Sequence, residues 1–224
     1  MNIDPIAYIR TEFPEKFGIP RQSGLADKLQ ARIIFEPEYR NPDAVRGLEG
    51  FSHIWLIWEF SANRRSGWQP TVRPPRLGGN EHMGVFATRS PFRPNPLGLS
   101  CVRLERIESD PKYGPVIYVR GADIMDGTPI YDIKPYVKYA DSRPHAVCGY
   151  VDTLPERVLK VVLPSEHSDT VKDRDIIPAL VEALSLDPRP SYHDDPERVY
   201  GLSFAGYNVR FVVKDGVLTV VGIE

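Results

Sequence analysis

The stretch Phe51–Phe60, FSHIWLIWEF, is an almost continuous apolar run of ten residues. Such a run is typical of a strand buried on both faces or of a segment of a core helix. Ten residues is short for a helix, and the aromatic and β-branched side chains favour a strand. We therefore predict a buried strand here.

Further short strands are predicted on both sides of this run, separated by glycine and proline. They cover Ala31–Phe35, Met83–Ala87, Leu97–Ile107 and Pro115–Ala122. No part of the first 150 residues has a sustained helical periodicity. The pattern predicts a mainly β fold, in which residues 1–150 form an antiparallel sheet or a closed barrel.

After residue 150 the pattern changes to a mixture of helix and strand. Apolar residues in Thr170–Leu186 recur at helical spacing. Asn208–Ile223 holds two β-branched runs on either side of Asp215-Gly216, which is a strong hairpin signal. We place the domain boundary between residues 150 and 165, and we predict a small α+β domain over residues 165–224.

Composition excludes several classes of protein. The 224 residues are 42% hydrophobic and 26% charged, as in soluble globular chains. There is no apolar run of transmembrane length and no signal-peptide pattern, so we expect neither a membrane span nor secretion. Cys101 and Cys148 have no CxxC or Cys/His spacing around them. We therefore expect free thiols, no metal site and a cytoplasmic location.

Arginine is concentrated in one part of the chain. The formal net charge is −2, yet the segment Arg64–Arg106 holds eight arginines and two acidic residues. The planar guanidinium group suits phosphates and can stack on nucleobases. Arg73, Arg76 and Arg93 follow prolines or lie among them, so they are candidates to bind RNA phosphates from stiff loops. Surface ion pairs are the alternative interpretation.

Two segments carry the residue types from which a site could be built. Val85–Ser100, VFATRSPFRPNPLGLS, has three prolines that make a stiff loop, and a loop that is rigid before binding loses less entropy when a ligand docks. In Gly121–Asp141, the residues Asp132, Lys134 and Tyr136 alternate, so an extended chain places them on one face. They suit proton transfer, or they are solvated residues of an edge strand. The chain has no GxGxxG, P-loop, GxSxG or HExxH motif.

Together these segments resemble the TrmO/TsaA family of bacterial tRNA methyltransferases. The matching stretches are FGIPRQSG (17–24), AVRGLEGFSHIW (44–55), TVRPPRLGGNEHMGVFATRSPFRPNPLGLS (71–100) and DIMDGTPIYDIKPY (123–136). The resemblance implies a single-sheeted β-barrel that acts as a homodimer. It also implies S-adenosylmethionine as cofactor and tRNA as partner, with methylation of N6 of threonylcarbamoyladenosine at position 37 of threonine tRNAs.

The motif match also implies the residues of the cofactor site. These are Pro20, Arg21, Gln22, His53, Ile54, Arg89, Leu99, Asp126, Gly127, Thr128 and Pro129. Arg21 or Arg89 is expected to hold the cofactor's carboxylate. The general base is not identified, and Asp126, Asp132 and Tyr136 are the candidates to receive the proton that N6 loses.

Two other functions stay open on the residues alone. The chain could be a non-catalytic RNA-binding β-barrel, or an enzyme that uses another adenosine-containing ligand. A single saturable site for S-adenosylmethionine would distinguish the methyltransferase from the RNA-binding barrel. Since every matched cofactor loop precedes residue 150, we expect residues 1–150 to bind the cofactor without the rest, and residues 165–224 to assist tRNA binding.

Overall fold

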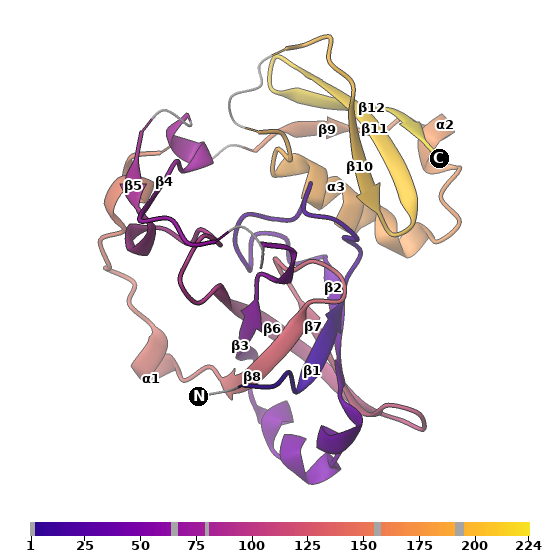
Figure 1. Ribbon diagram of the computed structural model, residues 1–224. Helices are drawn as coiled ribbons and strands as arrows, with labels where there is room; N and C mark the ends of the chain where they lie inside the picture. Colours follow the sequence, from indigo (N-terminus) through magenta and orange to yellow (C-terminus); the bar gives the residue numbers. More distant parts are fainter. Residues whose placement is uncertain (1–2, 64–66, 79–80, 155–157, 191–194) are drawn as a thin grey trace.

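The computed structural model describes residues 3–63, 67–78, 81–154, 158–190 and 195–224. Six strands close into a barrel in which all neighbours are antiparallel. Around the barrel they are β1 (Ala7–Arg10), β2 (Gln30–Phe35), β7 (Gly114–Arg120), β6 (Leu97–Asp110), β3 (His53–Glu59) and β8 (Pro129–Pro135). Figure 1 shows the barrel below a second, smaller sheet. The predicted β-barrel is therefore confirmed.

The barrel interior is filled by alternate side chains of its strands. On β3 the residues Ile54, Leu56 and Trp58 are buried, whereas Trp55 and Ile57 are only half-buried. The strand is therefore fully covered on one face and partly covered on the other. Each large apolar side chain removed from water contributes roughly 1.5–3 kcal/mol to folding.

Turns and 3-10 helices connect the barrel strands. They are η1 (Pro37–Tyr39), η2 (Pro42–Val45), η3 (Leu48–Gly50), η4 (Ser61–Asn63) and η5 (Pro75–Leu77). The strand predicted over Met83–Ala87 is shorter than expected. Strand β5 (Met83–Gly84) pairs with β4 (Thr71–Val72), and the chain then turns into η6 (Val85–Ala87). The turn closes when the backbone N–H of Thr88 bonds to the carbonyl of Val85, whose side chain is buried.

The C-terminal part is a four-stranded sheet with short helices. Its strand order is β10 (Tyr200–Phe204), β11 (Tyr207–Lys214), β12 (Val217–Ile223) and β9 (Lys160–Val162). Between β8 and β9 the chain forms α1 (Lys138–Asp141) and η7 (Gly149–Thr153), and the helical segments of the C-terminal part are α2 (Ser165–Ser168), η8 (Arg174–Ile176) and α3 (Ile177–Ser185) (Figure 1). The predicted helix and hairpin are both confirmed. Asp215 and Gly216 have φ of 51° and 74°, the left-handed pair that a two-residue hairpin turn requires.

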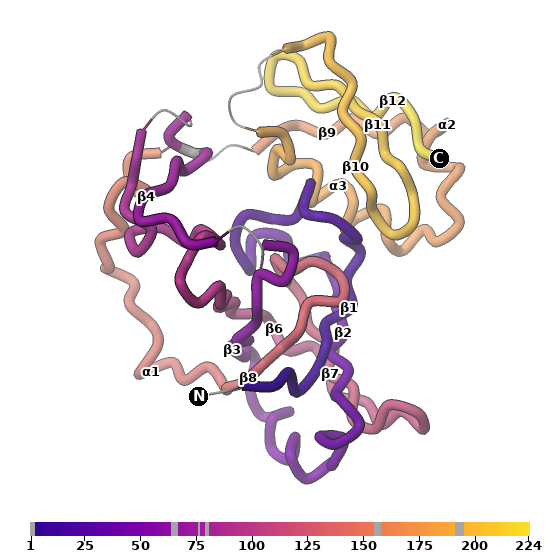
Figure 2. The backbone as a smooth tube through the Cα atoms, viewed as in Figure 1, coloured from indigo at the N-terminus to yellow at the C-terminus, as the bar shows by residue number. Residues whose placement is uncertain are grey.

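The connection between β1 and β2 packs against this C-terminal sheet (Figure 2). Phe13 lies in the same apolar cluster as α3 and β10–β12, with its ring 5.3 Å from that of Phe204 in an edge-to-face contact. The backbone N–H of Ala205 donates to the carbonyl of Glu12 at 2.9 Å. Gly18 has a φ of 88°, and a Cβ there would lie 2.1 Å from Leu202. The C-terminal sheet thus fixes a loop that belongs, in sequence, to the barrel.

Within the described ranges, no helix is both long enough and apolar enough to cross a membrane.

Candidate cofactor pocket

A cavity of about 450 Å³ lies at one rim of the barrel. Its volume is within the roughly 300–1,000 Å³ that small-molecule sites occupy. The walls come from the end of β3, the start of β6 and four connecting segments, which lie within residues 16–22, 60–63, 88–93 and 123–128. Six residues of the predicted cofactor set line it: Pro20, Arg21, Gln22, Arg89, Leu99 and Thr128.

Two aromatic rings form one wall of the cavity. The rings of Trp58 and Phe60 lie 4.4 Å apart between centroids and are inclined at 61°. Trp58 is paired in register with Gly98, and a Cβ on Gly98 would lie 2.3 Å from the indole ring. Glycine is therefore required at position 98, because the indole lies directly across the backbone of β6.

A chain of hydrogen bonds runs from this wall to a carboxylate. The indole N–H of Trp58 donates to Ser100 Oγ at 2.9 Å, and Ser100 Oγ donates to Asp123 Oδ1 at 2.5 Å. Ser100 is completely buried, and Asp123 lines the cavity. Burial raises the pKa of Asp123, and the hydrogen bond from Ser100 reduces that increase.

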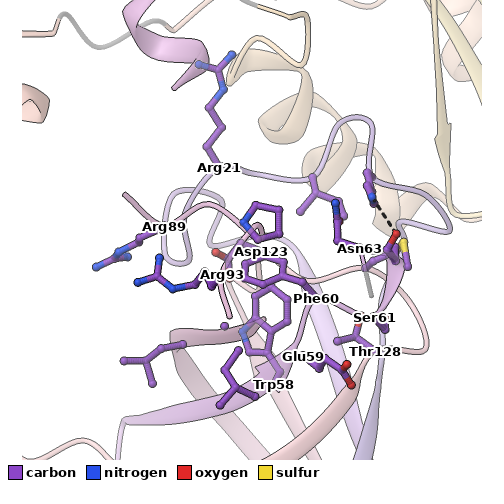
Figure 3. Close-up of a pocket in the computed structure, with 18 of the residues that line it drawn as sticks. Arg21, Trp58, Glu59, Phe60, Ser61, Asn63, Arg89, Arg93, Asp123 and Thr128 are labelled. Carbon is purple, nitrogen blue, oxygen red and sulfur yellow. Dashed lines mark hydrogen bonds between the residues drawn. The ribbon is translucent and has the colours of Figure 1, made fainter. Parts of the chain in front are cut away.

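Three arginines also line the cavity, and Figure 3 shows that Arg21 points away from Arg89 and Arg93, which extend to the same side. Arg21 extends away from the aromatic rings and donates to the carbonyls of Asp187 and Arg189 at 3.4 and 3.2 Å. Arg89 donates to Gln22 Oε1. Arg93, predicted as an RNA contact, donates to the carbonyls of its own loop at Val85 and Thr88.

Other residues of the predicted cofactor set lie outside this cavity. His53 and Ile54 are at the opposite end of β3, where Ile54 belongs to the barrel core and His53 Nδ1 is 2.9 Å from Ser52 Oγ. Gly127 bonds through its N–H to the carbonyl of Ile9.

Pro129 and Asp126 are the last two residues of the predicted cofactor set that lie outside this cavity. Pro129 begins β8 and is buried. Asp126 faces a second, polar cavity of about 320 Å³. There it accepts hydrogen bonds from the backbone of Thr11 at 3.0 Å and pairs with Arg10 at 3.2 Å.

The remaining candidate residues lie outside the cavity of about 450 Å³. Asp132 pairs with Lys134 at 2.9 Å, and the Tyr136 ring lies 6.0 Å from that of Trp55. Arg73 is exposed and donates to His82 at 3.0 Å. The backbone of Arg76 lies in η5, and its side chain is outside the described part of the structure. Among the described residues, no group of three His, Cys, Asp or Glu side chains is placed to hold a metal ion.

Several lining residues were not singled out from the sequence, among them Trp58, Glu59, Phe60 and Asp123. Trp58, Glu59 and Phe60 are the last three residues of the apolar run Phe51–Phe60. The acidic residue Glu59 within this run was a sequence signal that could have pointed to the site. Glu59 is buried and accepts a 2.5 Å hydrogen bond from the hydroxyl of Tyr131. Asp123 precedes the DGTP turn by three positions and carried no separate signal.

Comparison with known proteins identifies the family. The model of the tRNA-methyltransferase O N-terminal domain matches residues 8–142, and that of the TrmO C-terminal domain matches residues 159–224. The tRNA (adenine(37)-N6)-methyltransferase of Escherichia coli (strain K12) is 40% identical, with 99% of this chain and 97% of that protein covered. A putative S-adenosylmethionine-dependent methyltransferase RcsF of Pseudomonas aeruginosa is also 40% identical, with 94% and 91% covered.

Solved structures agree with these relatives. The crystal structure of TrmO from Pseudomonas aeruginosa superposes with a TM-score of 0.80 at 31% identity, and the match covers 100% of this chain and 98% of that one. The two domain models, the full-length relatives and the shared architecture lead to one conclusion: this chain belongs to the TrmO family.

Proposed function

We propose that this protein is an S-adenosylmethionine-dependent tRNA methyltransferase that methylates N6 of adenosine 37. The proposed substrate is threonylcarbamoyladenosine in threonine tRNAs, as the motif resemblance implies. The relative from Escherichia coli is a tRNA (adenine(37)-N6)-methyltransferase, which supports the activity and the position, and the relative from Pseudomonas aeruginosa is a putative S-adenosylmethionine-dependent methyltransferase, which supports the cofactor. The observation that carries the proposal is the cavity of about 450 Å³, which combines aromatic faces, guanidinium groups and a carboxylate.

These groups fit the chemistry of the cofactor, which combines an adenine, a carboxylate and a positively charged sulfur. Trp58 and Phe60 offer flat faces for adenine or for a cation. Arg89 and Arg21 line the cavity and are the guanidinium groups that we propose to hold the carboxylate. When bound, the cofactor supplies an electrophilic methyl group.

The protein's contribution to catalysis is mainly alignment. An in-line displacement gains most of its acceleration when the two reacting atoms are held in the correct geometry. The proline loop around Arg89 and the strand pair of β3 and β6 are both fixed before binding, because carbonyls of the loop accept from Arg93 and Trp58 is locked over Gly98.

The identity of the proton acceptor stays a prediction. Asp126, Asp132 and Tyr136 are the proposed candidates, and none of them lines the cavity of about 450 Å³. Asp126→Asn, Asp132→Asn and Tyr136→Phe separate them through pH–rate profiles. The true base is the one whose replacement removes the acidic limb of the profile.

We further propose that Arg73, Arg76 and Arg93 contact the tRNA backbone and that the C-terminal sheet assists tRNA binding. Arg73 is exposed and carries no salt bridge within the described residues, which supports a phosphate contact. Arg73→Ala should reduce the salt dependence of tRNA affinity by about 0.7–0.9 in slope. An unchanged slope in a normally folded variant would remove Arg73 from the interface.

The proposal also includes a homodimer in the cytoplasm. Tyr139 is 91% exposed, so this large side chain is accessible to a second copy, which supports the dimer. Both cysteines are free, as expected in a reducing compartment. Light scattering on the purified chain tests the dimer.

Two measurements test the activity itself. Calorimetric titration with S-adenosylmethionine should give a single saturable site. A non-catalytic RNA-binding barrel would give no saturable heat. Mass spectrometry of nucleosides from tRNA of a deletion strain should then reveal unmethylated threonylcarbamoyladenosine, and unchanged nucleosides would refute the proposed substrate.

A further inference from the structure

The carboxylate of Asp123 faces the cavity, and it is in contact with none of the basic side chains that the structure describes. Asp123 lines the cavity, and within the described residues no basic side chain forms a salt bridge with it. Arg89 influences Asp123 through its charge, but its own hydrogen bond goes to Gln22.

An anion in this position is unfavourable unless something compensates it. Burial raises the pKa of Asp123, because a carboxylate loses hydration there. The Ser100 hydroxyl and the backbone amides of Asp123 and Ser23 oppose that shift by hydrogen bonding to the carboxylate. Ser100 is itself held by the Trp58 indole, so the carboxylate and the aromatic wall form one rigid unit. A fixed carboxylate beside an aromatic face suits a cation.

We propose that Asp123 is the anionic partner of the sulfonium of bound S-adenosylmethionine, with the Trp58 ring completing the same cation site. This inference rests on the proposed function. It adds an assignment that the sequence motifs did not give, since they pointed to Asp126, which faces the other cavity.

The assignment has a consequence for the reaction cycle. Methyl transfer forms the bond from carbon to N6 and breaks the bond from carbon to sulfur. Sulfur keeps the bonding electron pair and becomes a neutral thioether, and the proton of N6 leaves to the base or to solvent. The positive charge that Asp123 recognises is therefore lost from the product. Asp123 thus favours binding of the cofactor over retention of S-adenosylhomocysteine.

Calorimetry with three ligands tests this assignment on the full-length protein. S-adenosylmethionine carries a sulfonium and an ammonium, S-adenosylhomocysteine only the ammonium, and 5′-methylthioadenosine neither. Asp123→Asn should weaken the first about tenfold or more, the effect of one nearby opposite charge, and leave the other two unchanged. Asp27→Asn is the matched control, because Asp27 is an exposed carboxylate paired with Arg103 at 2.9 Å and does not line the cavity. It should leave all three affinities unchanged.

Each other outcome overturns the assignment. Equal losses for S-adenosylmethionine and S-adenosylhomocysteine, with methylthioadenosine retained, would move Asp123 to the ammonium group. Losses for all three ligands would mean a structural role. If Asp123→Asn does not fold, the affinities of the wild-type protein test the proposal instead. The wild-type protein should bind S-adenosylmethionine more tightly than S-adenosylhomocysteine, and equal or reversed affinities refute the proposal. A wild-type protein that binds neither ligand refutes the proposed function instead.

Discussion

Replacing Gly98 by alanine tests how the pocket wall is built. A Cβ at this position would lie 2.3, 2.5 and 2.6 Å from three atoms of the Trp58 indole. The ring cannot yield easily, because its N–H is bonded to the buried Ser100 and its edge packs against Phe60. The ring must therefore swing away from β6, and the direction open to it is the cavity.

The expected cost follows from three contributions. Overpacking costs about 1–3 kcal/mol. Breaking the hydrogen bond between Trp58 and Ser100 adds about 0.5–1.5 kcal/mol. Replacing glycine by alanine within a strand stabilises the fold by about 0.5–1 kcal/mol, because alanine loses less backbone entropy on folding. The net destabilisation is then about 0.5–4 kcal/mol, which lowers the melting temperature of a chain of this size by about 1–16 °C. Affinity for S-adenosylmethionine should fall by about tenfold or more, equivalent to 1.4 kcal/mol.

The measurements are thermal unfolding, near-ultraviolet circular dichroism of the tryptophans, and calorimetry with the cofactor. Gly84→Ala is the control, because no atom lies within 4 Å of a Cβ there and its φ of −55° suits alanine. It should leave stability unchanged or raise it by about 0.4–1 kcal/mol. Gly98→Ala should cost nothing once Trp58→Ala has removed the ring. An equal cost in both backgrounds would refute the account.

Three other perturbations have defined outcomes. Arg89→Ala should weaken S-adenosylmethionine binding by about 1.5–3 kcal/mol in calorimetry. Arg106→Ala should leave this affinity unchanged, because the guanidinium of Arg106 lies over the Tyr118 ring outside the barrel. Equal affinities of the two variants would remove Arg89 from the site. Burial and the charge of Asp126 raise the pKa of Glu12, so its contribution to stability is full below its usual pKa and is lost as pH rises through the higher folded value. Glu12→Gln should therefore be more stable than wild type at pH 7 in urea unfolding, with a difference that vanishes below about pH 4, and a constant difference would contradict this. Truncation after residue 150 should abolish cofactor binding, and a truncated chain with wild-type affinity would show that the loop folds alone.

Truncation is expected to abolish cofactor binding because, in the structure, the loop that carries Arg21 is held by the C-terminal part of the chain. The loop that carries Arg21 lies before residue 150, so the sequence alone predicts that the first 150 residues bind the cofactor. In the structure Phe13 and Leu29 are buried in the C-terminal apolar cluster, and Arg21 bonds to the carbonyls of Asp187 and Arg189. Contacts over more than 150 positions leave no local pattern in the sequence.

The barrel strands show where local pattern suffices. Strands β2, β3, β6 and β7 were predicted because each has enough apolar or β-branched residues to favour a strand by itself. Strand β1, Ala7–Arg10, has only four residues, and its pairing with β2 and β8 determines its conformation. The hairpin before β11 was not predicted either, since Ala205 supplies a φ of 50° where the usual signals are asparagine or aspartate.

The site, like the fold, could be predicted from the sequence only in part. The motifs identify the loops, but they do not tell which side chain of a loop faces the cavity. In the turn after Ile124, the carbonyl of Phe13 accepts from the backbone of Asp126, and the Asp126 carboxylate reaches Thr11. Asp123, three positions earlier, reaches Ser100 on β6. Neither orientation follows from alternation, because the chain between them is not a strand.

The placement of the cavity follows from the size of the barrel. Interiors of six- to eight-stranded barrels are filled by side chains. Here Ile9, Ile33, Ile54 and Ile117 are all completely buried. A ligand of the cofactor's size therefore has to bind at the rim, where loops extend the walls beyond the strands. Rim loops come from distant parts of the sequence and need proline, glycine and side-chain hydrogen bonds to stay ordered. For this reason much of the matched motif sequence lies in loops, while strand positions that face the rim, such as Gly98 and Ser100 on β6, are also constrained.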